Sequence, residues 1–429
     1  MKISSLVKRL FSSRKINDSN VIRVGKGYSA TSINTTIFRR SSLTTKDGFQ
    51  FISFYDPKGR VVIGKRVIGK KKWLLKKTPF QANVKDAHNG ISIGIDGDGF
   101  LHLAYGMHAS PLKYARSKQP YSLCLQPLKV MDGKEEEKVT YPQFFSQPNG
   151  DLLFTYRSGR SGNGSMVLKK YSLATKKWET IHSNLIDGEG ERNAYWQMCR
   201  DKKGSLHLSW VWRETPDVAS NHDLCYAKSN DGGISWERSD GTKYELPITL
   251  TNAEIIKVIP QNSELINQTS IEADDKGNPY IASYWRDQDS NVPQFRVVWH
   301  DGTGWHDCQV GNRSTPFSLQ GKGTKMVPIS RPVILIDNKK VLYIFRDQER
   351  ESKVSLATTE NISSDKWLIT DLTDFSVDAW EPTFDNDLWT EERILNLFLQ
   401  VTHQGDGEKL AGEKGESSKV YVMNVDVRE

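Results

Sequence analysis

The chain has 429 residues, of which 37% are hydrophobic, 10% aromatic and 26% charged, with a formal net charge of +7. Its mean hydropathy of −0.57 excludes a membrane protein, and no apolar run approaches the roughly 18 residues that a spanning helix needs. The isoelectric point near 8.9 suits either an acidic partner or solubility alone. Nucleic-acid-binding motifs are absent from the sequence, so the chain is not expected to bind nucleic acid.

The N-terminal segment is basic and lacks the apolar core of a secretory signal. We expect residues 1–20 to be a flexible basic tail and residues 21–429 to form a single domain. On this ground alone the sequence predicts a cytoplasmic protein. The four cysteines are scattered without C-x-x-C spacing, which argues against a disulfide framework.

A polar turn followed by a short apolar strand recurs along the rest of the chain. The seven turns lie at 47–48, 96–99, 149–150, 201–204, 275–277, 337–340 and, more weakly, 385–387. A repeat of about 50 to 60 residues is typical of β-propeller blades, which are small sheets that bury both faces only when the ring closes. The sequence therefore predicts an all-β fold, a seven-bladed propeller of four-stranded antiparallel blades.

The segment from Ser229 to Trp236 has the form S-x-D-x-G-x-[ST]-W, the Asp-box hairpin of sialidase-like propellers. In this hairpin the Asp231 side chain holds the turn and Trp236 packs between strands. We assign it a structural role.

Basic side chains recur at one position of the repeat. Nine residues after the turn glycine, three blades carry His108, Arg213 and Arg286. His88 stands eleven residues before Gly99, and antiparallel pairing therefore places it beside His108 at the end of the hairpin away from the turn. The residues expected to line one mouth of the ring are His88, His108, Arg157, Arg213, Arg286 and Arg331, with Tyr156 and Tyr195 close by. A structural alternative is that these arginines pair with aspartates of neighbouring blades.

This set of side chains favours β-elimination from a uronic acid. Arginine or protonated histidine neutralises the sugar carboxylate, so that the proton on the adjacent carbon becomes acidic. A histidine or an activated tyrosine then takes that proton, and a tyrosine hydroxyl protonates the leaving oxygen. Glycosidases generally need a pair of free carboxylates, which this cluster does not offer.

Several segments around these residues resemble the BNR-repeat propeller polysaccharide lyases, a group that includes ulvan lyases and rhamnose–glucuronate lyases. The resemblance rests on residues 86–90, 105–112, 155–164 and 210–216. It implies that the catalytic residues are His88, His108 and Tyr156, with Tyr156 as acid or acid/base. Arg213 is the match for a carboxylate-neutralising arginine, Asn89 is a further substrate-binding candidate, and Lys170 stands where relatives carry an arginine.

The resemblance also implies a secreted or periplasmic protein, a monomer that needs no cofactor, and room for a structural Ca²⁺ or Zn²⁺. His222 and Cys225 form a candidate half zinc site. The predicted function is a polysaccharide lyase that cleaves a rhamnose–glucuronate or rhamnose–iduronate glycan and leaves a 4,5-unsaturated uronate. The alternatives are a non-catalytic propeller that binds acidic glycans and a glycoside hydrolase, either an exo-rhamnosidase or sialidase-like.

Overall fold

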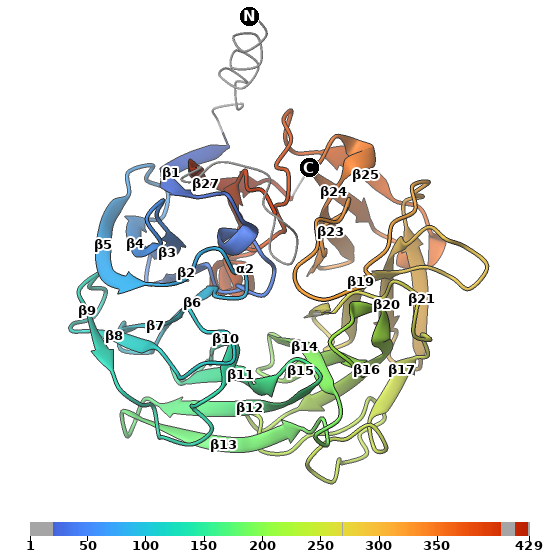
Figure 1. Cartoon of the computed structure of the whole chain (residues 1–429), viewed down its shortest axis with the longest axis horizontal. Coiled ribbons are helices and arrows are strands. Elements are labelled where there is room, and N and C mark those ends of the chain that lie inside the picture. Colours follow the sequence, from blue (N-terminus) through green and yellow to red (C-terminus); the bar gives the residue numbers. More distant parts are fainter. Residues whose placement is uncertain (1–19, 268, 405–416, 428–429) are drawn as a thin grey trace, which may run out of the picture.

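Seven antiparallel sheets surround a central axis in the computed structural model, which describes residues 20–267, 269–404 and 417–427 (Figure 1). Six sheets have four strands and the seventh has three. The predicted seven-bladed propeller is thus confirmed. The expected basic tail lies outside the described residues, except for residue 20.

Each of the six four-stranded blades is built from strands that follow one another in the chain. The first three blades are β2 (Leu43–Lys46), β3 (Phe49–Tyr55), β4 (Arg60–Val67) and β5 (Leu74–Gln81); β6 (Ile91–Ile95), β7 (Leu101–Tyr105), β8 (Tyr114–Ser117) and β9 (Leu125–Leu128); and β10 (Val139–Ser146), β11 (Leu152–Arg160), β12 (Asn163–Ser172) and β13 (Lys177–Ile186). The next three are β14 (Asn193–Arg200), β15 (Leu206–Arg213), β16 (Asn221–Ser229) and β17 (Glu254–Lys257); β18 (Ser270–Ala273), β19 (Pro279–Trp285), β20 (Gln294–His300) and β21 (Trp305–Val310); and β22 (Val333–Asp337), β23 (Lys340–Asp347), β24 (Lys353–Thr359) and β25 (Leu368–Asp371).

The seventh blade closes the ring by joining the two ends of the chain. Strand β1 (Val21–Tyr28) pairs with β27 (Ser417–Val425), which pairs with β26 (Leu395–Gln400). A single antiparallel bridge, Phe384 with Leu397, stands on the inner side of this sheet in place of a fourth strand. Pairing of distant segments removes the open edge that a linear array of blades would leave.

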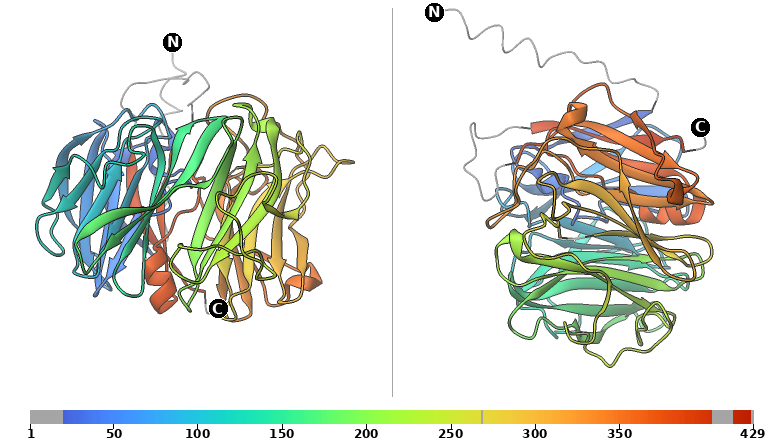
Figure 2. Two further views of the ribbon diagram at one scale, coloured as in Figure 1. Left: turned by 90° about the horizontal axis from the view of Figure 1, so that it is seen from below. Right: turned by 90° about the vertical axis from the view of Figure 1, so that its right-hand side faces the viewer.

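The first six predicted turns each join the first two strands of a blade, whereas the seventh forms a helix. Helix α2 (Asn386–Glu392) begins after Asp385, whose side chain accepts a hydrogen bond from the Leu388 amide at 3.1 Å. The side views in Figure 2 show the strands running between two mouths, with α2 at one of them. A cavity of about 480 Å³ at this mouth is lined by the turns of several blades and by α2, so we call it the turn mouth.

The other helical segments of the described residues are single 3₁₀ turns, η1 (Ser32–Asn34), η2 (Val218–Ser220), η3 (Gln348–Arg350) and η4 (Ile362–Ser364). Among the described residues, the helices are all too short to cross a membrane. The Asp box has its expected structural role, because the Asp231 carboxylate accepts from the Ile234 and Ser235 amides at 3.0 Å. Trp236 is buried in an apolar cluster of its blade.

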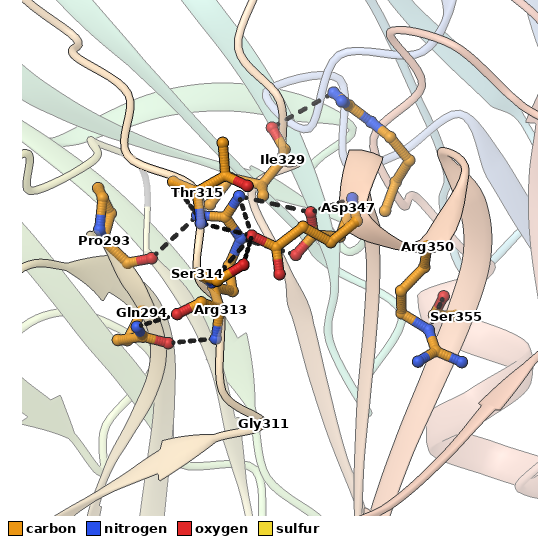
Figure 3. Close-up of polar contacts among 12 residues, drawn as sticks. Pro293, Gln294, Gly311, Arg313, Ser314, Thr315, Ile329, Asp347, Arg350 and Ser355 are labelled. Carbon is orange, nitrogen blue, oxygen red and sulfur yellow. Dashed lines mark hydrogen bonds and ion pairs between the residues drawn. The ribbon is translucent and has the colours of Figure 1, made fainter.

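Neighbouring blades are also joined by buried charge. Arg313, on the segment between β21 and β22, donates to Asp347 Oδ2 at 2.7 Å and to the Pro293 carbonyl at 3.1 Å (Figure 3). The Gln294 side chain holds the Arg313 backbone from below, with its Oε1 accepting at 2.8 Å. These contacts fasten the long β21–β22 segment beside the mouth opposite the turns.

Candidate functional site

A cavity of about 280 Å³ opens at the mouth opposite the turns, where the strands of several blades end. We call it the cavity mouth. Its walls combine aromatic rings with basic side chains, a composition that suits an anionic sugar. Among the lining residues are Phe38, His88, His108, Tyr141, Arg157, Tyr195, Arg213, Arg331, Arg346 and Glu381.

His88 and His108 lie side by side in this cavity. The β6–β7 hairpin pairs Ile91 with Tyr105, and the Gly106 amide continues the ladder by donating to the Gly90 carbonyl at 3.2 Å. The next positions along the same register are 88 and 108. The two imidazole rings stack with centroids 4.2 Å apart and planes inclined by 15°. The spacing of the turn in the sequence therefore predicts this contact.

Asp86 binds both histidines with one carboxylate, a feature that the sequence analysis did not single out. Asp86 Oδ1 lies 2.8 Å from His88 Nδ1, and Oδ2 lies 2.7 Å from His108 Nδ1. Burial alone would raise the pKa of Asp86, but the hydrogen bonds and charge of the two histidines hold it well below its usual range. An Asp two residues before His88, within the segment 86–90 that carries the resemblance, is the signal that could have identified it.

Two arginines on neighbouring blades meet around a tyrosine hydroxyl. Arg157 Nη1 and Arg213 Nη1 lie 3.5 and 3.2 Å from the Tyr195 hydroxyl oxygen. Burial would raise the pKa of Tyr195, but the two guanidinium groups lower it to about 7. Within the described residues neither arginine makes an ion pair with a carboxylate. Even with Tyr195 ionised, the three side chains together keep a positive charge.

Tyr141 enters the cavity through an irregularity in its strand. The β10–β11 register shifts between Thr140 and Gln143, and Tyr141 has a positive φ of 60°, a strained conformation for an aromatic residue. Its ring lies under the Arg157 guanidinium at 5.1 Å and 6.0 Å from the His88 ring. Burial and the neighbouring Tyr195 raise the pKa of Tyr141, so its hydroxyl keeps its proton.

Arg331 lines the cavity but carries its own counter-charge. Its guanidinium donates to Glu381 through Nε at 2.7 Å, and both side chains are buried. The ring of Phe38 lies 5.0 Å below the same guanidinium and stacks at 5.5 Å on His88. Arg331 therefore has a structural role: it packs on Phe38, which in turn stacks on His88.

The expectation that Arg286 lines the cavity is wrong. Strand β19 ends at Trp285, and the Arg286 guanidinium turns outward to donate to the carbonyls of Ser290, at 3.0 Å, and Asn262. It lines a shallow outer hollow together with Glu264.

Tyr156 does not reach the cavity either. It precedes Arg157 on β11, and adjacent residues of a strand point to opposite faces. The Tyr156 side chain is fully buried, and its hydroxyl donates to the Glu135 carbonyl at 2.9 Å. Tyr156 therefore anchors the loop that precedes β10.

Two further substrate-binding candidates also have structural roles. Lys170 is paired with Leu153 near the turn mouth and forms an ion pair with Asp151 at 3.2 Å, because β12 runs away from the cavity. Asn89 is buried in the turn after Asp86, where its side chain donates to the Asn83 carbonyl at 3.1 Å.

The candidate half zinc site, His222 and Cys225, gains no third potential metal ligand among the described residues. His222 contacts Glu214 at 2.9 Å and Asp223 at 3.0 Å, and Cys225 is buried in an apolar cluster. The β15–β16 register shifts between Leu224 and His222, so His222 and Cys225, paired with Trp212 and Trp210, lie on the same face of the sheet. Within the described residues, only Asp86, His88 and His108 bring three potential metal-ligand atoms within 4.8 Å of one another, and the contacts inside that trio have hydrogen-bond lengths.

Comparison with known proteins identifies the family of this chain. Residues 49–313 match the family described as BNR repeat-containing, which is more than half of the chain. The chain belongs to the BNR repeat-containing family. The matched span includes blades two to five and about half of the cavity residues, among them the histidine pair, Arg157 and Arg213.

Curated relatives of this family member are ulvan lyases. It is 23% identical over 310 residues to an ulvan lyase of Alteromonas sp. (strain LOR), covering 61% of this chain and 62% of that protein. It is 27% identical over 183 residues to a long-isoform ulvan lyase of Alteromonas sp, covering 38% of this chain and 18% of the relative. The chain thus spans less than two thirds of these relatives.

Solved structures share the fold over nearly the whole chain. The polysaccharide lyase Uly1 aligns with a TM-score of 0.68 at 14% identity, covering 96% of this chain and 98% of that one. A polysaccharide lyase of family PL25, an ulvan lyase, aligns with a TM-score of 0.66 at 16% identity and covers 96% of both chains.

Proposed function

We propose that this protein is a polysaccharide lyase that cleaves a uronic-acid-containing glycan by β-elimination. One observation carries the proposal: Arg157 and Arg213 have no carboxylate partner among the described residues, and they share a cavity with two histidines held by Asp86. Unpaired guanidinium groups in a largely enclosed site provide strong stabilisation for a sugar carboxylate and for the enolate that forms from it.

The roles follow from the position and protonation of each group. The substrate carboxylate binds Arg157 and Arg213. Their positive charges neutralise the carboxylate and so make the proton on C5 more acidic. His108 is the more accessible histidine, with 37% of its side chain exposed, and is proposed to take the C5 proton through Nε2. Tyr141 keeps its proton and is proposed to donate it to the leaving glycosidic oxygen. The C5–H and C4–O bonds break, and a C4–C5 double bond forms.

The relatives support the class of substrate. Several curated relatives are named ulvan lyases, and one solved PL25 ulvan lyase holds -[GlcA(1-4)Rha3S]-. A glycan in which a uronate alternates with a deoxysugar is therefore the first substrate to test. The proposed reaction uses side chains alone as acid and base.

Product analysis on a panel of uronic-acid glycans tests the proposal. β-Elimination gives a product that absorbs in the ultraviolet through its conjugated double bond and is lighter by one water than the hydrolysis product. We expect both signals, and we expect them to vanish together in the His108→Ala variant. Binding of the glycans without either signal would instead select a non-catalytic glycan-binding propeller, and heavier, non-absorbing products would select a hydrolase.

A further inference from the structure

The contacts around Asp86 determine more than the position of the histidines. A carboxylate only accepts hydrogen bonds, so each of its contacts must be made by an N–H donor. Asp86 Oδ1 faces His88 Nδ1 at 2.8 Å and Oδ2 faces His108 Nδ1 at 2.7 Å. Both Nδ1 atoms therefore carry hydrogen. In a neutral imidazole this leaves the lone pair on Nε2, on the edge of the ring that points away from Asp86.

We propose that Asp86 is a positioning residue that holds His88 and His108 in the same tautomer, with hydrogen on Nδ1, and so presents Nε2 as the reactive atom. The inference deepens the proposed function, because a histidine can take the C5 proton only through a nitrogen that carries a lone pair. A carboxylate that orients a histidine base through Nδ1 is an established device in catalysis, but here one carboxylate serves two rings.

The local chain makes Asp86 a rigid support. Its Oδ1 also accepts from the His88 backbone amide at 3.0 Å, which closes an Asx turn within the segment itself. The Asn89 amide nitrogen donates to the Asp86 carbonyl at 3.2 Å. Because the side chain and the backbone are fixed by neighbours two and three residues away, the carboxylate keeps its direction without help from the substrate.

The rings are fixed on their faces as well as on their edges. His88 lies between Phe38, at 5.5 Å and 14°, and His108, at 4.2 Å and 15°. Stacking holds the planes parallel but leaves each ring free to exchange the positions of its two nitrogens by a flip. The hydrogen bonds to Asp86 fix Nδ1 as the nitrogen that carries hydrogen in each ring. Stacking therefore positions the rings, and Asp86 selects the tautomer.

Asp86→Asn is the informative substitution because it preserves shape and changes hydrogen-bonding capacity. An amide has one acceptor oxygen and one donor nitrogen. It can accept from one Nδ1–H as before, but it must donate to the other ring, which then accepts at Nδ1 and carries hydrogen on Nε2. One histidine is thus driven into the tautomer that cannot accept a proton at Nε2.

The experiment records the tautomers of histidine side chains by long-range ¹H–¹⁵N nuclear magnetic resonance on the ¹⁵N-labelled full chain, in the presence of a chelator. Spectra of His88→Ala and His108→Ala assign the two signals. We expect both rings to carry hydrogen on Nδ1 in the wild-type protein and one ring to switch in Asp86→Asn. Hydrogen on Nε2 of either ring in the wild type, or two unchanged rings in Asp86→Asn, would overturn the proposal.

Activity gives a second, separate readout. On a glycan that the wild-type protein cleaves, we expect kcat of Asp86→Asn to fall roughly 10²- to 10⁴-fold with little change in KM, because proton transfer is lost and the binding arginines remain. Asp301→Asn is the matched control: Asp301 contacts His306 Nε2 at 2.8 Å at an exposed position outside the cavity, and its kcat is expected to stay unchanged.

The two readouts also separate this proposal from the proposed function. The wild-type tautomers can be measured on a protein that shows no turnover, so a failed assay would count against the lyase and not against the role of Asp86. If Asp86→Asn does not fold, Asp86→Glu retains a carboxylate. We expect it to keep both rings in the Nδ1–H tautomer and to retain more kcat than Asp86→Ala. Equal loss in the Glu and Ala variants would contradict the positioning role.

Discussion

The two sides of the cavity carry the same type of side chain in different electrostatic settings. At the ends of β11 and β15, Arg157 and Arg213 face a tyrosine hydroxyl and no carboxylate among the described residues. Across the cavity, Arg331 is paired with Glu381, and Arg346 donates to the carbonyls of Val327, at 3.0 Å, and Ile329, at 3.3 Å.

The difference separates arginines that remain able to bind an anionic ligand, the binding charge, from arginines held by the protein's own groups, the structural charge. A guanidinium that already holds a buried carboxylate has little attraction left for an anionic ligand, whereas an unpaired one gains from binding it. The spacing of arginines around a propeller thus indicates where positive charge gathers, and the carboxylates of the neighbouring segments decide which of them remain available. The following experiments test this division.

The largest effect is expected from His108→Ala. Loss of the proposed base should lower kcat on a cleavable uronate glycan by roughly 10²- to 10⁴-fold, measured from the ultraviolet absorbance of the product. His306→Ala removes an exposed histidine outside the cavity and should leave kcat unchanged. An active His108→Ala protein would remove this histidine from the reaction and leave Tyr195 or His88 as the base.

The comparison of the two sides is sharpest in a pair of variants, Arg213→Gln and Arg331→Gln. Arg331→Gln leaves Glu381 buried without its partner and should cost about 3 to 5 kcal/mol in the free energy of unfolding. Arg213→Gln removes hydrogen bonds to the Tyr195 hydroxyl and to the Pro216 and Asp217 carbonyls, but it leaves no buried carboxylate of the described residues without its partner, and it should cost about 1 to 2 kcal/mol.

The loss of activity should follow the opposite order, with Arg213→Gln affected more than Arg331→Gln. Arg213→Gln should lower kcat/KM roughly 10²-fold, because one of the two charges on the substrate carboxylate is lost. Arg331→Gln should retain most of its activity at temperatures where it stays folded. Denaturant unfolding and initial rates on the same preparations measure both quantities. If the two variants lose stability and activity in the same proportion, the division between binding and structural charge is wrong.

Two tyrosines provide a second contrast, between the cavity and the blade interior. Tyr141→Phe removes the proposed proton donor and should lower kcat by about 10²-fold while the thermal midpoint changes little. Tyr156→Phe removes the hydrogen bond to the Glu135 carbonyl and should cost about 1 kcal/mol of stability with activity retained. The two variants differ from the wild type by one oxygen atom each, so each is the control for the other.

Regular pairing made part of this site predictable. The turn at 96–99 fixes the register of β6 and β7, and this places His88 opposite His108. The recurrence of the same turn and strand along the chain likewise predicts the seven blades. The resemblance places Tyr156 in the site, but Tyr156 and Arg157 are adjacent on one strand and cannot share a face. Strand alternation alone would have removed it from the candidates.

Other features depend on contacts that spacing does not encode. Tyr141 reaches the cavity because the ladder shifts between Thr140 and Gln143. Pro142, which cannot donate to the ladder, marks the irregularity in the sequence, but the repeat spacing does not show which side chain the shift turns into the cavity. Arg331 and Glu381 pair across 50 residues, between different blades. Long-range pairing of this kind depends on how the ring closes, so it could be recognised only in the structure.

The smallest effect is a pH dependence centred on Tyr195. Its pKa in the folded protein is lowered to about 7, against about 10 in an unfolded chain. Between these values the unfolded state holds a proton that the folded state has released, so the contribution of Tyr195 to stability increases as pH rises from about 7 to about 10 and is lost as pH falls through about 7. Relative to Tyr195→Phe, the wild-type free energy of unfolding should therefore rise over this interval. Tyrosinate absorbance that is present in the wild type near pH 8 and absent from the variant provides an independent measurement. A difference between the two proteins that does not vary with pH would show that Tyr195 stays protonated, and the positive charge of Arg157 and Arg213 would then be wholly available to the substrate.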